Sequence, residues 1–345
     1  MRWLRKRFPD WALVVMIVVA VVAIAVSAVA LGISNLLNQD KEPRSFSGPS
    51  SPYIARIKVI GEISGSASRF ASSDNAYHHR WTMQTIDTLI GDENNKGICL
   101  WLDTPGGAVY ESDELYLKLM EYKEKTGRPI YSYMLRIAAS GGYYVAAASD
   151  EVYANRNAWT GSIGVTIGTL FDVTGFLEKY GVQTETITSG RNKAMGSYYE
   201  PLTEEQREIF QSLVDDAYDR FIEIVALGRG MTVKEAVVIG DGRLYTAGQA
   251  LEAGLIDGIF GEREAEAEIR AKFEDKPAIV DCFYRADTNY LSVFALSLTG
   301  GKGLFGLLFG EGGAPVNQGD VAAVLELARA QEESYEPPIK YLYTG

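Results

Sequence analysis

Histidine and cysteine are scarce in this chain, whose 345 residues contain only two of each. A zinc centre needs several Cys or His side chains at characteristic spacing, and the sequence has no such cluster. Cys99 lies in an apolar, strand-like run where a free buried thiol is the usual outcome, and the spacing neither supports nor excludes a bond to Cys282. We therefore expect no metal site and no cofactor.

The two histidines, His78 and His79, are neighbours in a polar segment. Adjacent residues of an extended chain point in opposite directions, so at most one of them can face a given site. A Ser-His-Asp enzyme would have to take its base from this pair, whose surroundings are typical of a loop. If the chain uses a serine nucleophile, we expect its base to be another kind of residue.

Clustered positive charge is also lacking. The formal net charge is −12, and beyond the first ten positions the basic residues are scattered. Nucleic-acid binding needs a concentrated basic face, so no nucleic-acid partner is expected. The hydrophobic share of 47% allows a sizeable core, and the length suits one large domain or two ordinary ones.

The N-terminal part does contain one long apolar run. Residues 1–10 are basic, and residues 11–37 carry no charge, which is longer than the about 20 apolar residues that cross a bilayer as a helix. The basic flank predicts a single-pass membrane anchor with a cytoplasmic N-terminus and the remaining chain outside. A signal peptide cleaved near Ala28-Val29-Ala30 is the alternative, but the run exceeds the roughly 7–15 residues usual for one. Residues 38–52, with several Pro, Gly and Ser, predict a flexible tether.

From residue 53 the pattern alternates between strands and helices. Strands are predicted at Ile54–Ile63, at Gly97–Leu102 and from Pro129 onward, with helical spacing at Met83–Leu89 and from Val109 to about Lys125 between them. This alternation predicts an α/β fold with a mostly parallel sheet. Later segments predict a short helix at Val173–Tyr180, a strand at Gln183–Thr188 and a long amphipathic helix after the capping-box pair Thr203 and Gln206.

The third strand leads into Ser140, which is followed by Gly141, Gly142 and a helical run of small residues. The glycines permit a tight strand-to-helix turn, and a helix N-terminus leaves free N–H groups. A serine in this position is either an acyl-transfer nucleophile or an ordinary N-cap, and the stretch alone favours the cap.

A second glycine-rich turn, Asp103-Thr104-Pro105-Gly106-Gly107, follows the preceding strand. Both turns follow strands and precede helices, so they should emerge at the same edge of a parallel sheet. The N–H groups of Gly107 and Gly141 can then converge on one oxygen. A base for Ser140 is offered by Lys193, in a glycine-bounded loop, although most loop lysines are solvated and a catalytic one must be held neutral by burial.

Several stretches together resemble one known family, the signal peptide peptidase A family of membrane-anchored Ser-Lys proteases. The matching stretches, in order, are Asp103–Gly107, Ala138–Tyr144, Thr160–Val165, Ser189–Lys193 and Gly242–Ala250, running on to Gly254–Asp257. Each is weak alone, but their order and spacing are specific, and the resemblance covers about Ile54 to Gly261.

The resemblance implies a Clp-protease/crotonase-like fold of repeated ββα and βαβ units. The roles that it implies are nucleophile for Ser140, general base for Lys193, oxyanion-hole amides for Gly107 and Gly141, and orientation of the lysine amine for Ser162 and Ser189. Asp103 stands where family members commonly carry Asn.

The resemblance also implies an endopeptidase that degrades apolar peptides, above all remnant signal peptides in the membrane. It implies homo-oligomers in which neighbouring protomers complete one site, so that Ser140 of one copy meets Lys193 of another. We expect the protease domain to cover residues 53–275. Residues 276–345 form a C-terminal extension, and its apolar run Tyr290–Phe309 is expected to lie along the membrane interface, to pack on the domain or to form an oligomer contact, with a second membrane span as the alternative. Three alternatives stay open: a Ser-Lys protease that cuts a membrane protein, an acyl-CoA enzyme on a crotonase-like fold, and a catalytically inactive membrane scaffold.

Overall fold

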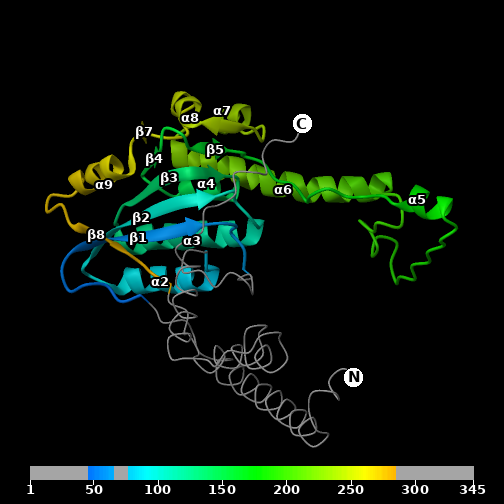
Figure 1. Ribbon diagram of the computed structural model, residues 1–345, viewed down its shortest axis with the longest axis horizontal. Helices are drawn as coiled ribbons and strands as arrows, with labels where there is room; N and C mark the ends of the chain where they lie inside the picture. The colour runs from blue at the N-terminus through cyan, green and yellow to red at the C-terminus, as the bar shows by residue number, and fades with distance from the viewer. Residues whose placement is uncertain (1–45, 66–76, 285–345) are drawn as a thin grey trace, which may run out of the picture. The chain divides into compact units, whose positions relative to one another are not determined.

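The computed structural model describes residues 46–65 and 77–284, which fall in one compact unit (Figure 1). In chain order its elements are β1 (Tyr53–Ile60), α2 (His79–Gly91), β2 (Asn95–Thr104), α3 (Val109–Thr126), β3 (Ile130–Ala139), α4 (Gly141–Ala146), β4 (Glu151–Ala154), β5 (Trp159–Gly161), α5 (Thr174–Lys179), α6 (Glu204–Arg229), α7 (Val233–Ile239), β6 (Leu244–Thr246), α8 (Ala247–Glu252), β7 (Gly258–Ile259), α9 (Glu262–Ala271) and β8 (Ala278–Asp281).

The predicted membrane anchor, most of the predicted tether and most of the C-terminal extension lie outside the described residues. Among the helices of residues 46–65 and 77–284, none has both the length and the apolar character that crossing a bilayer requires.

The strands form one eight-stranded sheet, in the order β6-β5-β3-β2-β1-β8, and off this path β4 pairs with β3 and β7 pairs with β4. Every pairing is parallel except that of β5 with β6. The central strand β2 is buried along nearly its whole length, as expected for a parallel strand covered on both faces. The predicted mostly parallel α/β sheet is therefore confirmed.

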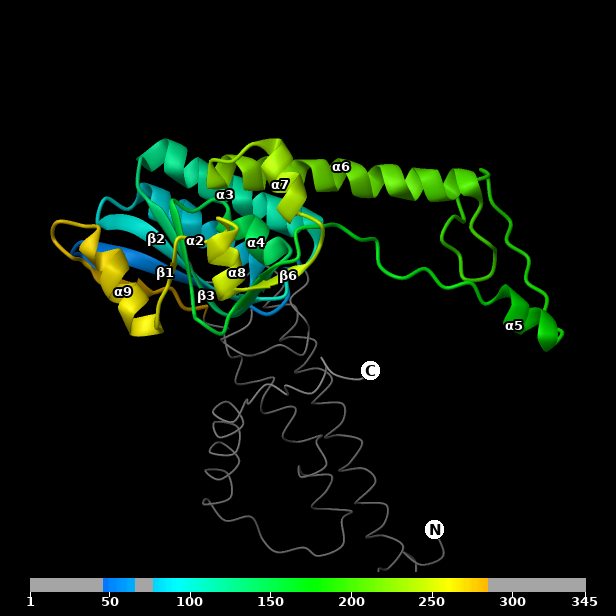
Figure 2. The same cartoon turned by 90° about the horizontal axis from the view of Figure 1, so that it is seen from above.

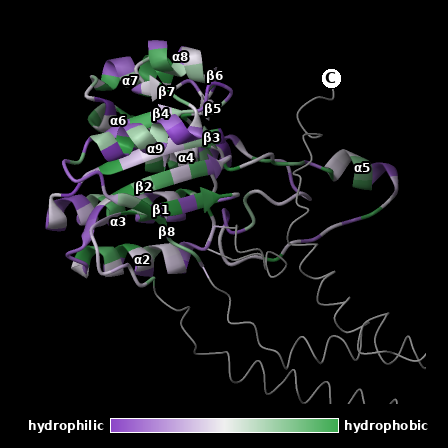
Figure 3. Ribbon diagram, turned by 60° about the vertical axis from the view of Figure 1, so that its left-hand side comes forward, coloured by the Kyte–Doolittle hydropathy of each residue, from purple (hydrophilic) through white to green (hydrophobic). Residues whose placement is uncertain are grey.

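Two apolar layers cover the sheet. On one face, α2, α3 and α4 and the C-terminal half of α6 pack on residues such as Ile57, Leu100 and Met134. On the other face, Ala265 and Ile269 of α9 pack on the side chains of alternate strand residues, among them Trp101. Figure 2 shows α3 and α9 on opposite sides of the strands, and Figure 3 shows the strands coloured mainly as hydrophobic.

The local signals for helix ends operate as the sequence predicts. Thr203 and Gln206 form the capping box that starts α6, and each bonds the backbone N–H of the other. Gly127 ends α3 in the left-handed conformation at φ +65°, which glycine adopts without steric cost.

The predicted strand at Gln183–Thr188 is wrong. These residues are exposed and form no strand, because no neighbouring segment of the described chain offers them a hydrogen-bonding edge. They belong to a projection, residues 166–203, that we call the arm. In Figures 1 and 2 the arm follows α6 outward from the sheet, with α5 at its far end.

The sheet also continues past the predicted end of the domain at residue 275. Strand β8 pairs with β1 from Tyr53↔Ala278 to Arg56↔Asp281. Its attachment is strengthened by Asp281, which accepts hydrogen bonds from Arg56 and Lys58 of β1. The first residues of the C-terminal extension therefore belong to the sheet.

Candidate functional site

Ser140 lies at the turn between β3 and α4, with strained backbone geometry. Its φ of 52° and ψ of −123° are costly for a residue with a side chain, and such strain clusters at functional sites. Its N–H donates to the Gly161 carbonyl at 2.8 Å, and its carbonyl accepts from the Tyr143 and Tyr144 amides. The side chain makes no capping hydrogen bond to α4, so the N-cap interpretation does not account for this serine.

The two glycine-rich turns meet beside Ser140, because glycine lets their backbones touch. A Cβ atom on Gly106, where φ is +102°, would lie 2.7 Å from the Gly141 nitrogen and 2.8 Å from the Ala139 carbonyl oxygen. A Cβ on Gly141 would lie 3.3 Å from the Gly107 nitrogen. Side chains at these positions would force the two turns apart.

The backbone direction of Gly107 is set by a parallel bridge to Ile63. The Ile63 N–H donates to the Gly106 carbonyl at 2.8 Å, and the Ala108 N–H donates to the Ile63 carbonyl at 2.9 Å. Since backbone groups alternate along a strand, the Gly107 N–H faces away from Ile63. Gly107 and Gly141 both line the pocket that holds Ser140, as an oxyanion hole requires.

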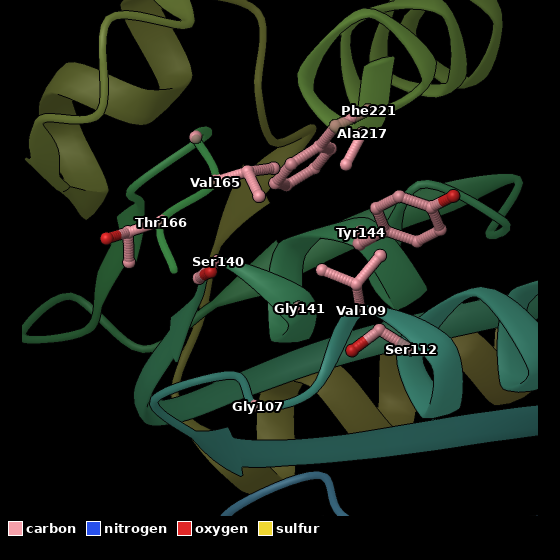
Figure 4. Close-up of a pocket in the computed structure, with 11 residues that line it drawn as sticks. Gly107, Val109, Ser112, Ser140, Gly141, Tyr144, Val165, Thr166, Ala217 and Phe221 are labelled. Carbon is pink, nitrogen blue, oxygen red and sulfur yellow. The ribbon is translucent and has the colours of Figure 1, made fainter. Parts of the chain in front are cut away.

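The pocket beside Ser140 is formed by the N-terminal turn of α3, by α4, by residues 164–166 and by α6 (Figure 4). Its apolar lining comes from Val109, Tyr144, Val165, Ala217 and Phe221. The Ser112 hydroxyl, also in the lining, donates to the Ala108 carbonyl at 2.9 Å. The pocket therefore suits an apolar side chain of a peptide bound next to Ser140.

Tyr144 is a fixed wall of this pocket. Its hydroxyl donates to Asp113 at 2.5 Å, and its ring packs against Phe221 with centroids 4.9 Å apart. Burial, together with the hydrogen bond to Asp113, raises the pKa of Tyr144 well above its ordinary value. The phenol is therefore neutral and acts as a structural donor.

Lys193 is not among the residues that line the Ser140 pocket. It is exposed, on the arm, in a turn closed by its own N–H donating to the Gly190 carbonyl at 3.0 Å. Its neighbours Arg191 and Asn192 both contact Glu205 in the first turn of α6. At 1.5 Å per residue, roughly 24 Å of helix separate Glu205 from Phe221 at the pocket. One chain alone does not bring Lys193 to Ser140.

Ser162 and Ser189, the two serines predicted to orient the lysine amine, lie in different parts of the structure. Ser162 is next to the site, because Gly161 pairs with Ala139 and the Ser162 N–H donates to the Arg243 carbonyl at 2.7 Å. Its φ of 49° makes it a second strained serine at the same sheet edge. Ser189 is exposed on the arm, near Lys193 in the chain.

Histidine and cysteine do not contribute to the site. His79, in the first turn of α2, bonds Tyr77 at 2.5 Å and Glu114 at 2.7 Å and joins α2 to α3. Cys99 and Cys282 are free thiols buried in different apolar layers. Burial raises the pKa of both thiols above the ordinary value, so neither is a reactive thiolate. The described residues contain no group of His, Cys, Asp or Glu that could hold a metal ion.

Some pocket residues carry no individual signal in the sequence. Ala217 and Phe221 belong to the predicted apolar face of α6, and the structure divides that face between core and pocket. Val109 and Ser112 sit one helical turn apart in α3, a spacing that would have placed them on one face. The interactions of Arg136 with Asp103 join residues far apart in the chain, which no local pattern reveals.

A family model and the related proteins point to the same family of serine proteases. The model of peptidase family S49 matches residues 122–274. A protein of Enterococcus faecium named "Putative signal peptide peptidase SppA" is 36% identical over 265 residues, covering 77% of this chain and 75% of that protein. A chloroplastic serine protease SPPA of Arabidopsis thaliana is 31% identical over 220 residues, covering 64% of this chain and 32% of that protein.

Among solved structures, a ClpP1 mutant of Listeria monocytogenes is similar with a TM-score of 0.40 and 13% sequence identity. That similarity covers 61% of this chain and 92% of the ClpP1 chain.

Proposed function

Since this chain belongs to peptidase family S49 and is a serine protease, we propose that it cleaves peptides with Ser140 as nucleophile and Lys193 as general base. The observation that carries the proposal is the strained Ser140 turn. The Ser140 hydroxyl makes no capping hydrogen bond to α4, and Ser140 lines one pocket together with Gly107 and Gly141. A serine that only capped α4 would use its side chain for that purpose.

In the proposed reaction the Ser140 Oγ attacks the carbonyl carbon of the scissile bond while the Lys193 amine accepts the hydroxyl proton. The amides of Gly107 and Gly141 bind the oxyanion of the tetrahedral intermediate. The protonated lysine then gives its proton to the leaving amine, and the acyl-enzyme remains. Water, activated by the same amine, hydrolyses the ester and restores the free hydroxyl.

We propose that the lysine comes from a second copy of the chain. The contacts between the Lys193 loop and the start of α6 support this, because they hold the loop far from the pocket of its own chain. The arm also exposes large apolar side chains, including Phe171 (62% exposed), Phe176 (63%) and Ile187 (89%). Apolar residues exposed in one segment are typical of a surface that a partner covers. Burial against that partner would also desolvate the amine.

The proposed substrates are apolar peptides, above all signal peptides left in the membrane. The apolar lining of the pocket supports this class, since Val109, Tyr144, Val165, Ala217 and Phe221 offer no charged group to a bound side chain. A membrane anchor at residues 11–37 with an extracytoplasmic protease domain would keep the site near such substrates. Cleavage of a folded membrane protein, with signal peptides left intact, would instead favour the alternative substrate.

Labelling with a peptidyl phosphonate tests the dyad directly. We expect the phosphonate to form a bond to Ser140 in the wild type, no bond in Ser140→Ala, and labelling at least about 100-fold slower in Lys193→Ala. Lys179→Ala, on the same arm, and Ser212→Ala, exposed on α6, are the matched controls and should label like the wild type. Labelling of another residue, or unchanged labelling of Lys193→Ala, would contradict the assignment.

A further inference from the structure

An ion pair links the two strands that carry the proposed oxyanion hole. The Arg136 Nε donates to Asp103 Oδ2 at 2.7 Å, and its Nη2 approaches the same oxygen at 2.5 Å. The Asp103 side chain is only 7% exposed, whereas that of Arg136 is 62% exposed. A nearly buried carboxylate thus depends on a guanidinium that reaches it from the surface.

The pair sits at an irregularity of the sheet. Leu102 of β2 lies opposite Met134, but Thr104 lies opposite Ala138, so β3 has extra residues at this point. Before the irregularity β3 pairs with β4, and after it, from Ile137, β3 pairs with β5. Bulges of this kind redirect a strand and often lie beside active sites. Arg136 lies within the irregular stretch and ties it to β2.

Each partner of the pair is close in the chain to one oxyanion amide. Asp103 precedes the turn that ends at Gly107, and Arg136 precedes the turn that contains Ser140 and Gly141. Where the turns meet, they touch through backbone atoms, because Gly106 has no side chain there. The Ile63 bridge fixes one of the two turns, and interactions upstream of both turns can fix their separation.

We propose that the Asp103–Arg136 ion pair is a positioning device that sets the spacing of the two oxyanion amides. This inference rests on the proposed function, because it assigns to the pair a role in binding the oxyanion formed by Ser140. Breaking the pair lets the two turns shift relative to each other while the pocket for the substrate side chain, lined by α3, α4 and α6, is kept. Transition-state binding is then lost and substrate binding is retained.

The test compares Asp103→Asn, Arg136→Gln, Arg136→Lys and the double variant Asp103→Asn/Arg136→Gln with the full-length wild type. For each we measure kcat and KM on one apolar peptide, the inhibition constant of an aldehyde of the same peptide sequence, and the melting temperature. The Ser140 hydroxyl adds across the aldehyde C=O bond: Oγ bonds to the carbonyl carbon, the proton leaves Oγ and is transferred to the former carbonyl oxygen, and this hemiacetal oxygen occupies the oxyanion hole. Its affinity therefore reports on the hole.

We expect the single variants to lower kcat by about 10- to 100-fold, with KM within about twofold of the wild type. Aldehyde affinity should fall in proportion to kcat/KM. Arg136→Lys keeps the charge but not the planar guanidinium, so it should recover only part of kcat. The double variant should be no worse than Arg136→Gln, because it no longer leaves an unpaired buried carboxylate. Arg229→Gln, which breaks the remote pair with Asp257, should lower the melting temperature and leave kcat unchanged.

The inference is overturned if kcat and aldehyde affinity stay within about twofold of the wild type, or if every loss matches the fraction of unfolded protein. If Arg136→Gln does not fold, Asp103→Asn gives the same comparison with the shape of the side chain preserved. A wild type that the aldehyde does not inhibit, or a Ser140→Ala variant that stays active, would remove the proposed function itself. If the aldehyde inhibits the wild type and Asp103→Asn equally well, only the positioning role is contradicted and the proposed function stands.

Discussion

At the scale of single residues, the site depends on backbone conformations that side chains disfavour. Ser140 and Ser162 both have positive φ. The Ser140 N–H donates to the carbonyl of Gly161, the residue before Ser162. Gly106 has φ of +102° and touches the Gly141 turn. Such strain persists only where the surrounding structure fixes it, here through the sheet and the buried helix α4.

Replacing Gly106 with alanine should therefore damage the reaction more than the fold. The Cβ would lie 2.7 Å from the Gly141 nitrogen, so one of the two proposed oxyanion amides must move. We expect kcat to fall by about 100-fold or more, because removing one oxyanion donor costs that much in other hydrolases. Peptide cleavage rates and thermal unfolding measured on the same samples separate the two effects.

Gly127→Ala is the matched control for this substitution. Gly127 also has positive φ, at the end of α3, but a Cβ there meets no atom within 4 Å. It should reduce stability by about 1 kcal/mol and leave the kcat of the folded protein unchanged. Equal effects of both substitutions on kcat would count against a special role for the Gly106 turn.

Some features of the site could be predicted from the sequence and others could not. Strand-glycine-helix patterns are local, so the turns at Gly107 and Gly141 and their common sheet edge could be anticipated. The surroundings of Lys193 could not, because burial of a loop lysine depends on segments that pack from elsewhere, including another chain. The Asp103–Arg136 pair likewise joins two strands whose alignment only the sheet defines.

At the scale of elements, α6 has two roles along its length. Its C-terminal half carries Phe221, Ile222 and Val225 into the core, and Ala217 and Phe221 also line the Ser140 pocket. Its N-terminal half is largely exposed and carries the arm, with Phe210 lying against Gly196. The same helix therefore connects the Ser140 pocket with the arm that carries Lys193, the proposed base.

Enlarging Ala217 should change specificity. A phenylalanine there extends into the pocket beside Phe221 and Tyr144, so substrates with large apolar side chains should lose at least about tenfold in kcat/KM relative to those with alanine. Leu213 lies one turn earlier in α6 and is 55% exposed, so Leu213→Phe is the control and should leave kcat/KM unchanged for both kinds of substrate. Peptide pairs that differ at one position measure the ratio, and an unchanged ratio in Ala217→Phe would show that this pocket does not select the side chain.

Strand β8 gives the fold a dependence on pH. Burial opposes the ionisation of Asp281, but hydrogen bonds and ion pairs with Lys58 and Arg56 outweigh burial and lower its pKa below the ordinary value of 3.8. Because the folded protein binds the proton less tightly than the unfolded chain, the carboxylate stabilises the fold at neutral pH. That contribution is lost as the pH falls below about 4.

Asp281→Asn should accordingly be less stable than the wild type at pH 7, and the difference should shrink towards pH 3. Urea unfolding midpoints at a series of pH values measure it. A constant difference over the whole range would mean that the negative charge of Asp281 does not stabilise the attachment of β8 to β1.

Long, strongly patterned elements were the ones that the sequence could predict. β1, β2, β3, α3 and α6 follow runs of apolar residues or clear caps, whereas the short strands β4, β7 and β8 depend on partners distant in the chain. The strand predicted at Gln183–Thr188 has the residues of a strand but no partner edge in its own chain. Pattern alone cannot supply such an edge.

At the scale of the whole molecule, the proposed site consists of two incomplete halves. The Ser140 pocket holds the proposed nucleophile and the proposed oxyanion donors, and the arm carries Lys193 about 24 Å of helix away from it. Exposed aromatic and aliphatic side chains on the arm provide the surface that a second copy can cover. Assembly would then bring Lys193 of one copy to Ser140 of another, exclude water from the site and activate the protease in one step.

Mixing two inactive variants tests this most directly. Ser140→Ala and Lys193→Ala, co-expressed or refolded together so that subunits exchange, should each be inactive alone and recover peptide cleavage when mixed. At equal amounts about one site in four should pair an intact serine with an intact lysine. A chain with both substitutions, mixed with either single variant, should stay inactive. Recovered activity near that fraction is the predicted result, and mixed assemblies that stay inactive at every ratio would contradict the shared site.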